Sequence, residues 1–257
     1  MSTSIHPTAI VHKGADLGEN VSIGPFACIG KDVTIGLGTS IENFAVIKSG
    51  TFIGKNCRIF QGAIIGEIPQ DLKFAGEKTE TRIGDNTTVR EFVTINRGTS
   101  ALGYTKVGKN VLLMAYSHIA HDCIVGDNVI MANKATLGGH VEIGNWAFLG
   151  GGVLVHQFCK VGEHALIAAG FRAVQDVPPF IWASGEPIKY SGINSVGLKR
   201  RGFSSEERQL IKQVYTLYFR SKIPRTKALD EIKNKFPNNP VGKVIVDFIE
   251  KSNRGII

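Results

Sequence analysis

Two histidines and an aspartate stand close together in the segment 117–123, which has the sequence Ser-His-Ile-Ala-His-Asp-Cys. His118 and His121 are three residues apart, and Asp122 directly follows the second histidine. A histidine takes or gives a proton near neutral pH, and a neighbouring carboxylate orients its ring. Histidine and aspartate are also ligands for zinc. The segment therefore predicts a site of proton transfer or of metal binding.

A six-residue repeat runs through the first two-thirds of the chain and decides how these side chains are held. Counting in sixes from Ile5 to Ile167, 25 of 28 positions carry a large aliphatic residue, with Met131 included among them. Glycine often comes one residue later, and a small or β-branched residue comes four residues later. This period fits neither an α-helix nor a long strand. It predicts short strands with a turn every six residues.

The repeat resembles that of the hexapeptide-repeat transferases. The resemblance implies a mainly β fold, a left-handed parallel β-helix that is triangular in section and has three repeats per coil. Coils about 4.8 Å apart would then stack positions that are three repeats apart in the sequence. A sandwich of ordinary strands does not keep one phase over so long a segment.

The frame of six fails over residues 67–82 and 96–106, which we expect to be loops that leave the coil. Loops on a rigid scaffold often carry function. The prolines of the segment 176–179 end the repeat, because proline cannot donate to a strand ladder. We therefore expect a β-helix over residues 1–180 and a small C-terminal helical domain over residues 181–257.

The last part of the chain changes to helical spacing. Ser204 with Glu207 three residues later predicts a capping box at the start of a helix, and Pro224 ends that helix. Two further helices are expected over residues 226–236 and 241–251.

Stacking of each coil on the next would bring polar groups together. His121 shares a column with Gly139 and Gln157, and Asp122 stacks on His140 in the next column. A base, its acidic partner and a backbone N–H donor would thereby converge, which is the set that acyl transfer needs. A single histidine is more often structural, but four of the seven histidines fall in this one part of the repeat, which favours a site.

Six motifs taken together resemble the UDP-N-acetylglucosamine O-acyltransferases, and the match covers nearly the whole chain. The resemblance implies transfer of an (R)-3-hydroxyacyl group from acyl carrier protein to the 3-position of UDP-N-acetylglucosamine, the step that opens lipid A synthesis. It also implies a homotrimer with active sites between neighbouring subunits, and no cofactor. The motifs are Gln-Asp-Leu-Lys (70–73), Thr-Ile-Asn-Arg-Gly-Thr (94–99), His-Ile-Ala-His-Asp-Cys (118–123), Val-His-Gln-Phe-Cys (155–159), Asp-Val-Pro-Pro (176–179) and Gly-Leu-Lys-Arg-Arg-Gly-Phe (197–203).

Carried over position by position, the resemblance implies roles for single residues. His121 matches the general base, Asp122 its orienting partner, and the N–H of Gly139 the oxyanion donor. Ala169 matches a position near the far end of the acyl groove, so we expect it to help set acyl length. The residues that match cleft or sugar-nucleotide contacts are Asp71, Lys73, His118, His140, His156, Gln157, Asn194 and Arg200.

Two positions depart from the family pattern. Asn96 stands where histidine is expected, and Val196 stands where glutamate is expected near the nucleotide. These departures leave open whether the 3-position of the sugar carries oxygen or nitrogen. The length of the acyl chain is open as well.

Three other functions compete with this hypothesis. Carbonic anhydrases of the same fold bind zinc through histidines, and the spacing of His118 and His121 does not exclude such a site. The related N-acyltransferase of the pathway has an extra domain before its repeats, whereas the repeat begins at residue 5 in this chain. A scaffold without catalysis is disfavoured by the clustered histidines. We expect an O-acyltransferase that binds no metal.

The composition narrows the partners and the compartment. The net charge of +8 fits an acidic partner such as a carrier protein, and we expect no nucleic-acid partner. No apolar run is long enough to span a membrane and no signal peptide is present, so we expect a cytoplasmic protein. Three of the four cysteines occupy the small-residue slot of the repeat, which predicts buried apolar residues without disulfides.

Overall fold

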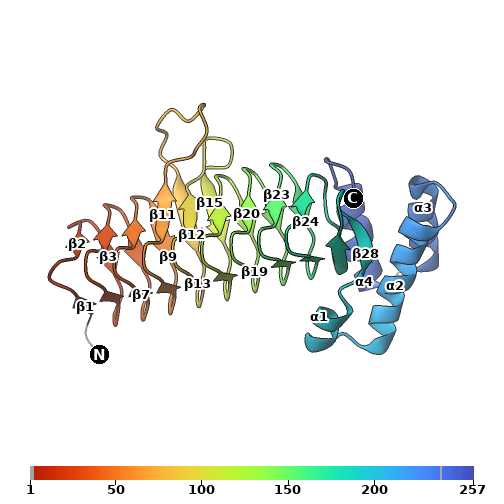
Figure 1. Cartoon of the computed structure of the whole chain (residues 1–257), viewed down its shortest axis with the longest axis horizontal. Coiled ribbons are helices and arrows are strands. Elements are labelled where there is room, and N and C mark those ends of the chain that lie inside the picture. Colours follow the sequence, from red (N-terminus) through yellow and green to blue (C-terminus); the bar gives the residue numbers. More distant parts are fainter. Residues whose placement is uncertain (1–2, 238) are drawn as a thin grey trace.

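The computed structural model describes residues 3–237 and 239–257. A long stack of coils is followed by a group of helices at the C-terminal end (Figure 1). Each coil contributes one short strand to each of three sheets, and strands of neighbouring coils pair in parallel. The predicted stack of short parallel strands is therefore confirmed.

The three sheets are named A, B and C. Sheet A contains β1 (Ser4–Ile5), β4 (Ser22–Ile23), β7 (Ser40–Ile41), β10 (Arg58–Ile59), β13 (Thr88–Val89), β16 (Leu112–Leu113), β19 (Ile130–Met131), β22 (Phe148–Leu149), β25 (Leu166–Ile167), β27 (Ile181–Ser184) and β28 (Lys189–Ile193). Sheet B contains β2 (Ile10–Val11), β5 (Cys28–Ile29), β8 (Val46–Ile47), β11 (Ile64–Glu67), β14 (Thr94–Asn96), β17 (His118–Ile119), β20 (Thr136–Leu137), β23 (Leu154–Val155) and β26 (Arg172–Ala173). Sheet C contains β3 (Asp16–Leu17), β6 (Thr34–Ile35), β9 (Thr51–Ile53), β12 (Glu80–Ile83), β15 (Tyr104–Val107), β18 (Ile124–Val125), β21 (Glu142–Ile143) and β24 (Lys160–Val161).

The aliphatic positions of the repeat form the core of the stack. Ile119 pairs in register with Leu137, which in turn pairs with Val155, so each coil takes three repeats here. These side chains are at most 3% exposed. Their burial between coils is the main stabilising contribution of the repeat, because each buried aliphatic side chain contributes about 1.5–3 kcal/mol.

Two segments leave the coil, at residues 68–79 and 97–103, and stand above the stack in Figure 1. Ile65 pairs with Ile95, which lies five repeat lengths further along the chain, and Ile95 pairs with Ile119, four repeat lengths further on. The excursions thus add lengths of two repeats and one repeat to the normal coil. The aliphatic frame regains its phase after each of them for this reason.

The turns between sheets form three corners along the stack, named A/B, B/C and C/A after the sheets that they join. Both excursions leave from the B/C corner, since they connect β11 to β12 and β14 to β15. Many corner residues have a positive φ. At the C/A corner, asparagine fills this position in several coils because it tolerates left-handed backbone better than most residues. These residues are Asn20, Asn56, Asn86, Asn110 and Asn128.

Four helices follow the coils: α1 (Ser195–Arg200), α2 (Ser205–Arg220), α3 (Arg225–Lys235) and α4 (Pro240–Glu250). α2 begins with the predicted capping box, in which Ser204 and Glu207 each accept a hydrogen bond from the other residue's backbone. The sequence pattern did not predict α1, a short helix that the Asn194 side chain caps.

Sheet A continues beyond the predicted end of the β-helix. β27 pairs in parallel with β25, and β28 then returns antiparallel to β27. The segment expected to be helical therefore starts with two strands. They lie outside the frame of six, so the repeat carried no sign of them.

The C-terminal residues pack back onto the last coil. Asp176 is fully buried and accepts hydrogen bonds from the N–H of Lys160 at 2.7 Å and the hydroxyl of Ser252 at 2.6 Å. The Tyr215 hydroxyl donates to the carbonyl of Pro179 at 2.6 Å. These contacts cover strand edges that would otherwise be open to pairing. None of the described helices combines the length and the apolar character that a bilayer crossing needs.

Candidate active site

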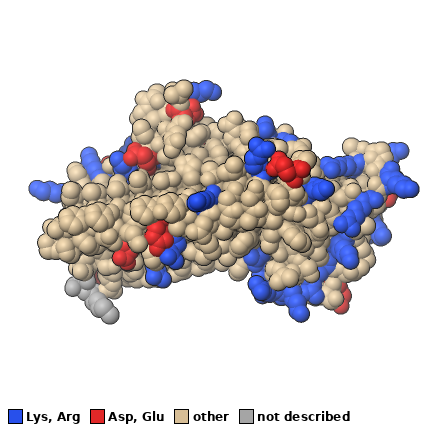
Figure 2. Space-filling model, in the orientation of Figure 1, with Lys and Arg blue, Asp and Glu red and all other residues tan. Residues whose placement is uncertain are grey.

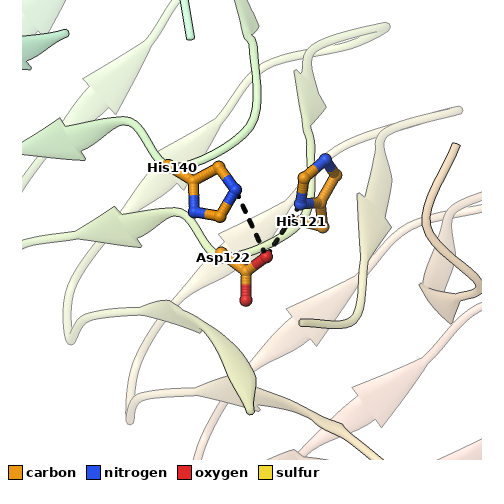
Figure 3. A group of neighbouring side chains, drawn as sticks. All are labelled: His121, Asp122 and His140. Carbon is orange, nitrogen blue, oxygen red and sulfur yellow. Dashed lines mark hydrogen bonds and ion pairs between the residues drawn. The ribbon is translucent and has the colours of Figure 1, made fainter. Parts of the chain in front are cut away.

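His121, Asp122 and His140 meet at the B/C corner, as Figure 3 shows. His121 and Asp122 form the turn between β17 and β18, and His140 lies one coil further, in the turn between β20 and β21. The backbone holds Asp122 and His140 at φ values of 58° and 60°. The side chain of Asp122 is fully buried, while those of His121 and His140 are 14% and 25% exposed. The two imidazoles are thus accessible from solvent, whereas the carboxylate of Asp122 is not.

Asp122 fixes the orientation of His121. The Nδ1 of His121 lies 2.8 Å from Oδ2 of Asp122. The carboxylate is held ionised: burial alone would raise its pKa, but hydrogen bonds from Thr99 and His121 outweigh burial and keep the pKa below its usual range. An ionised carboxylate accepts the Nδ1–H, so in the neutral imidazole the lone pair lies on Nε2 of His121. That nitrogen is free to act as a base.

The backbone of Gly139, in the next coil, packs against Nε2 of His121. A Cβ at residue 139 would stand 2.6 Å from Cε1 and 2.7 Å from Nε2 of His121, so only glycine leaves room for the ring. The carbonyl of Gly139 accepts the N–H of Phe158. Among the described residues, the Gly139 N–H makes no hydrogen bond. A donor next to the base is therefore available for a ligand.

His140 packs between two aromatic rings of the same corner. It stacks on Phe158 with ring centroids 4.5 Å apart and meets His121 edge-on at 5.1 Å. Its Nε2 lies 3.8 Å from Oδ2 of Asp122. Burial lowers the pKa of His140, and His121 lowers it further, against the opposing charges of Asp122 and Asp71. A neutral His140 therefore lines one side of the site as a polar group.

The remaining predicted residues near this corner take different positions. His118 lies on β17, half-buried, with Nδ1 2.7 Å from the Thr94 hydroxyl, and burial lowers its pKa. His156 and Gln157 are exposed on the turn after β23. Asp71 belongs to the 68–79 excursion, where its carboxylate accepts the N–H of Lys73, and it lies close enough to His140 to influence its charge.

Ala169, Asn194 and Arg200 do not join this corner. Ala169 and Asn194 line a separate pocket on sheet A together with Phe148 and Trp182. The Asn194 amide is buried and already occupied, since it accepts from the N–H of Gly197 and donates to the carbonyl of His164. Arg200 is exposed on α1. Within one chain, Ala169, the position expected to set acyl length, and His121, the expected base, lie on different corners.

The two departures from the family pattern also have defined places. Asn96 is 3% exposed, and its amide donates to the carbonyl of Ile68, where it holds the base of the 68–79 excursion. Val196 is 64% exposed and lines the pocket on sheet A.

Two residues at the site had no signal in the repeat. Thr99, in the 97–103 excursion, donates to Asp122 through both its N–H and its hydroxyl. Arg254, near the end of the chain, lies 3.3 Å from Nδ1 of His156. Both come from irregular segments, and the spacing of the repeat says nothing about where such segments return.

The donor set permits two kinds of chemistry. One nitrogen from each imidazole and one oxygen of Asp122 lie within 4.8 Å of one another, which would suit a divalent cation. Both oxygens of Asp122 already accept hydrogen bonds, however, and the free nitrogen of His121 lies against the backbone of Gly139. A base beside an available N–H donor is the arrangement for attack on a carbonyl.

Comparison with known proteins agrees with this geometry. The profile described as UDP N-acetylglucosamine O-acyltransferase, domain 2, matches residues 176–257, and the bacterial transferase hexapeptide profile matches residues 104–139. The acyl carrier protein–UDP-N-acetylglucosamine O-acyltransferases of Paracidovorax citrulli and Janthinobacterium sp. are 55% and 49% identical to this chain. The alignments cover 99% and 98% of this chain, and the same shares of the two relatives.

Solved structures give the same result. The UDP-N-acetylglucosamine acyltransferase from Bacteroides fragilis superposes with a TM-score of 0.96 at 46% identity, covering 98% of this chain and 99% of the other. LpxA from Acinetobacter baumannii superposes with a TM-score of 0.95 at 42% identity over the same shares. This chain therefore belongs to the UDP-N-acetylglucosamine O-acyltransferase family.

Proposed function

We propose that this protein transfers an (R)-3-hydroxyacyl group from acyl carrier protein to the 3-hydroxyl of UDP-N-acetylglucosamine, the opening step of lipid A synthesis. The observation that carries the proposal is the contact between the free nitrogen of His121 and Gly139, whose N–H has no acceptor among the described residues. The relatives named above support the choice of substrates.

The reaction follows from this arrangement. Nε2 of His121 removes the proton from the sugar hydroxyl, whose oxygen attacks the thioester carbonyl. The Gly139 N–H donates to the oxyanion that forms. When the carbon–sulfur bond breaks, the proton held by His121 passes to the leaving thiolate. Asp122 stabilises the imidazolium between the two transfers, because its carboxylate stays ionised.

The distribution of charge supports an acidic carrier protein as the donor. Residues 195–257 contain 14 lysines and arginines against 6 aspartates and glutamates, a net charge of +8. Residues 1–194 contain 16 of each kind, so the whole net charge of the chain lies at its C-terminal end. Figure 2 shows these cations gathered over the helices. Such a surface speeds the encounter with an acidic partner.

A homotrimer completes the site. The base lies at the B/C corner, whereas the pocket that contains Ala169 and Asn194 lies on sheet A. A second copy that presents its sheet A to this corner would bring acyl groove and base together, and closed cyclic symmetry would satisfy all three copies. The same proposal includes a left-handed coil, a C-terminal helical domain and a cytoplasmic location.

The test is the identity of the product. The protein is incubated with UDP-N-acetylglucosamine and a mixed pool of 3-hydroxyacyl carrier proteins, and the products are analysed by mass spectrometry. We expect a mono-acylated sugar nucleotide whose acyl group is released by mild alkali, as an ester is. An alkali-stable amide, or no acylated sugar, would contradict the proposal.

A further inference from the structure

We propose that Thr99 is a positioning residue for the His121 base and acts on it through Asp122. The inference rests on the proposed acyl transfer and assigns a role to the 97–103 excursion. Thr99 touches neither reacting group in this arrangement, so it is not itself catalytic.

Thr99 gives Asp122 two hydrogen bonds. Its N–H donates to Oδ1 at 2.9 Å, and its hydroxyl donates to Oδ2 at 2.7 Å. Oδ2 also accepts from Nδ1 of His121 at 2.8 Å. Two donors from one residue, one on each oxygen, fix the plane of the carboxylate. Hydrogen bonds to a charged group are about twice as strong as neutral ones, so the two hydrogen bonds from Thr99 hold the Asp122 carboxylate firmly.

The backbone beneath Asp122 is held as well. The Asp122 N–H donates to the Thr105 hydroxyl at 2.8 Å, on the strand that follows the excursion. Asp122 is thus fixed at its backbone and at both carboxylate oxygens by the segment 99–105. A carboxylate held in this way can keep the His121 ring in one orientation between the two proton transfers.

The excursion is built to place Thr99 there. A Cβ at Gly98 would clash with backbone atoms of Tyr104, so glycine lets the segment pack closely against the strand to which it returns. The N–H of Gly103 donates to the Thr99 carbonyl at 2.7 Å and closes the turn. Thr99 is 8% exposed, which protects its hydrogen bonds from competition with water.

The segment that carries Thr99 is also hydrogen-bonded to the other excursion. Oε1 of Glu77, in the 68–79 excursion, accepts the N–H of Ser100 at 3.0 Å. The segment that holds Asp71 and Lys73 is therefore tied to the residue next to Thr99. The position of the His121 base and the position of the 68–79 excursion therefore depend on one another.

Loss of the Thr99 hydroxyl has a definite electrostatic consequence. The carboxylate charge concentrates on the oxygen that faces His121, which stabilises the protonated imidazole. The base is then protonated up to a higher pH. Among the described residues, the other titratable groups whose charge interacts with this pair are His140 from the next coil, Cys123 next to Asp122, and Glu77 from the 68–79 excursion. Asp71 of the same excursion acts on His140. Replacement of Thr99 changes none of them chemically.

The experiment compares Thr99→Val, which keeps the shape and the backbone N–H, with Thr99→Ser, which keeps the hydroxyl. We expect Thr99→Val to lower kcat about tenfold, the worth of one hydrogen bond to a charged group. We expect the acidic edge of its pH–rate profile to move up by about half a unit, with KM for the sugar nucleotide within about twofold of wild type. Thr99→Ser should stay within about twofold of wild type on all three measures.

A second background shows whether Thr99 acts through Asp122. In Asp122→Asn protein, the added Thr99→Val change should cost less than about twofold, because the two residues act as a unit. Equal losses in both backgrounds, or an unchanged kcat and pH profile for Thr99→Val, would overturn the inference. If Thr99→Val melts early, Thr99→Ala removes the same hydroxyl and is held to the same outcomes.

The test separates this inference from the proposed function. If the wild-type protein forms no alkali-labile acylated sugar nucleotide, the proposed function is wrong. If it forms that product, and His121→Ala and Asp122→Asn lose turnover while Thr99→Val does not, only the role of Thr99 is wrong.

Discussion

His140 and His164 occupy equivalent places at two corners of the same stack. Both have left-handed backbone, with φ values of 60° and 56°. Both stack on an aromatic ring of the next coil, Phe158 for His140 and Phe180 for His164. Burial is the largest cause of a lowered pKa in each, to about 4 for His164. The repeat gives the two imidazoles nearly the same pose.

Their neighbours differ. His140 faces the buried carboxylate of Asp122 at the B/C corner. His164 at the C/A corner faces the guanidinium of Arg201, with Nδ1 and Nη1 3.3 Å apart. Both excursions leave from the B/C corner, and one of them supplies the donors that keep Asp122 ionised. The coil therefore provides positions, and the residues facing each position decide which corner can transfer protons.

The largest effect expected from this comparison is the loss of the base. His121→Ala should lower turnover about 10²- to 10⁴-fold, the usual worth of a general base, with little change in melting temperature. His164→Phe keeps the stacking at the other corner and should change turnover by less than about threefold. A His121→Ala protein with more than a third of wild-type turnover would remove His121 from the mechanism.

The fit of the His121 ring against its neighbouring coil comes next. Gly139→Ala places a methyl group 2.6 Å from the ring and forces it from its position, so we expect a loss of about 10²-fold in kcat. Gly14→Ala is the control on the same corner, since its Cβ meets only side-chain atoms, none nearer than 3.4 Å. Steady-state kinetics on both variants should separate them; equal activities would show that the ring tolerates displacement.

A smaller change is expected in acyl selection. Ala169 is exposed and lines the pocket on sheet A with Phe148, Leu166 and Trp182. Ala169→Met should shorten the preferred acyl chain with little loss of turnover on short donors, because the larger side chain fills the groove. Donors of several lengths are offered in competition to wild type and variant. An unchanged product distribution would place the limit on acyl length elsewhere.

The smallest effect concerns stability at the other corner. The pKa of His164 is lowered from 6.5 to about 4 in the folded protein, so the unfolded chain binds the proton first as the pH falls. His164 therefore reduces stability progressively from pH 6.5 toward pH 4. Thermal melts should show that Tm decreases in both proteins as the pH is lowered over that range. The decrease should be a few degrees smaller in His164→Phe than in wild type. An equal decrease of Tm in the two proteins would show that the lowered pKa of His164 does not cause the loss of stability.

The sequence predicted what depends on the repeat. The inward row through Ile119, Leu137 and Val155 follows from a coil of three repeats, and so do the two columns at the B/C corner, which pair His121 with Gly139 and Asp122 with His140. The sequence did not predict Thr99, because the course of an irregular excursion depends on tertiary contacts.

The pocket on sheet A was missed for a related reason. β27 and β28 lie outside the frame of six, and they set the place of Asn194 and of α1. Within one chain, His121 lies between β17 and β18 and Ala169 between β25 and β26, so the two residues lie on different corners.

We propose that the histidine–aspartate corner works by proton transfer, although the same three side chains stand close enough to hold a cation. The direct measurement is turnover and metal content of the purified protein before and after dialysis against a strong chelator. We expect unchanged turnover and no metal in proportion to the protein. Loss of zinc together with activity, and recovery of both on adding zinc back, would contradict it.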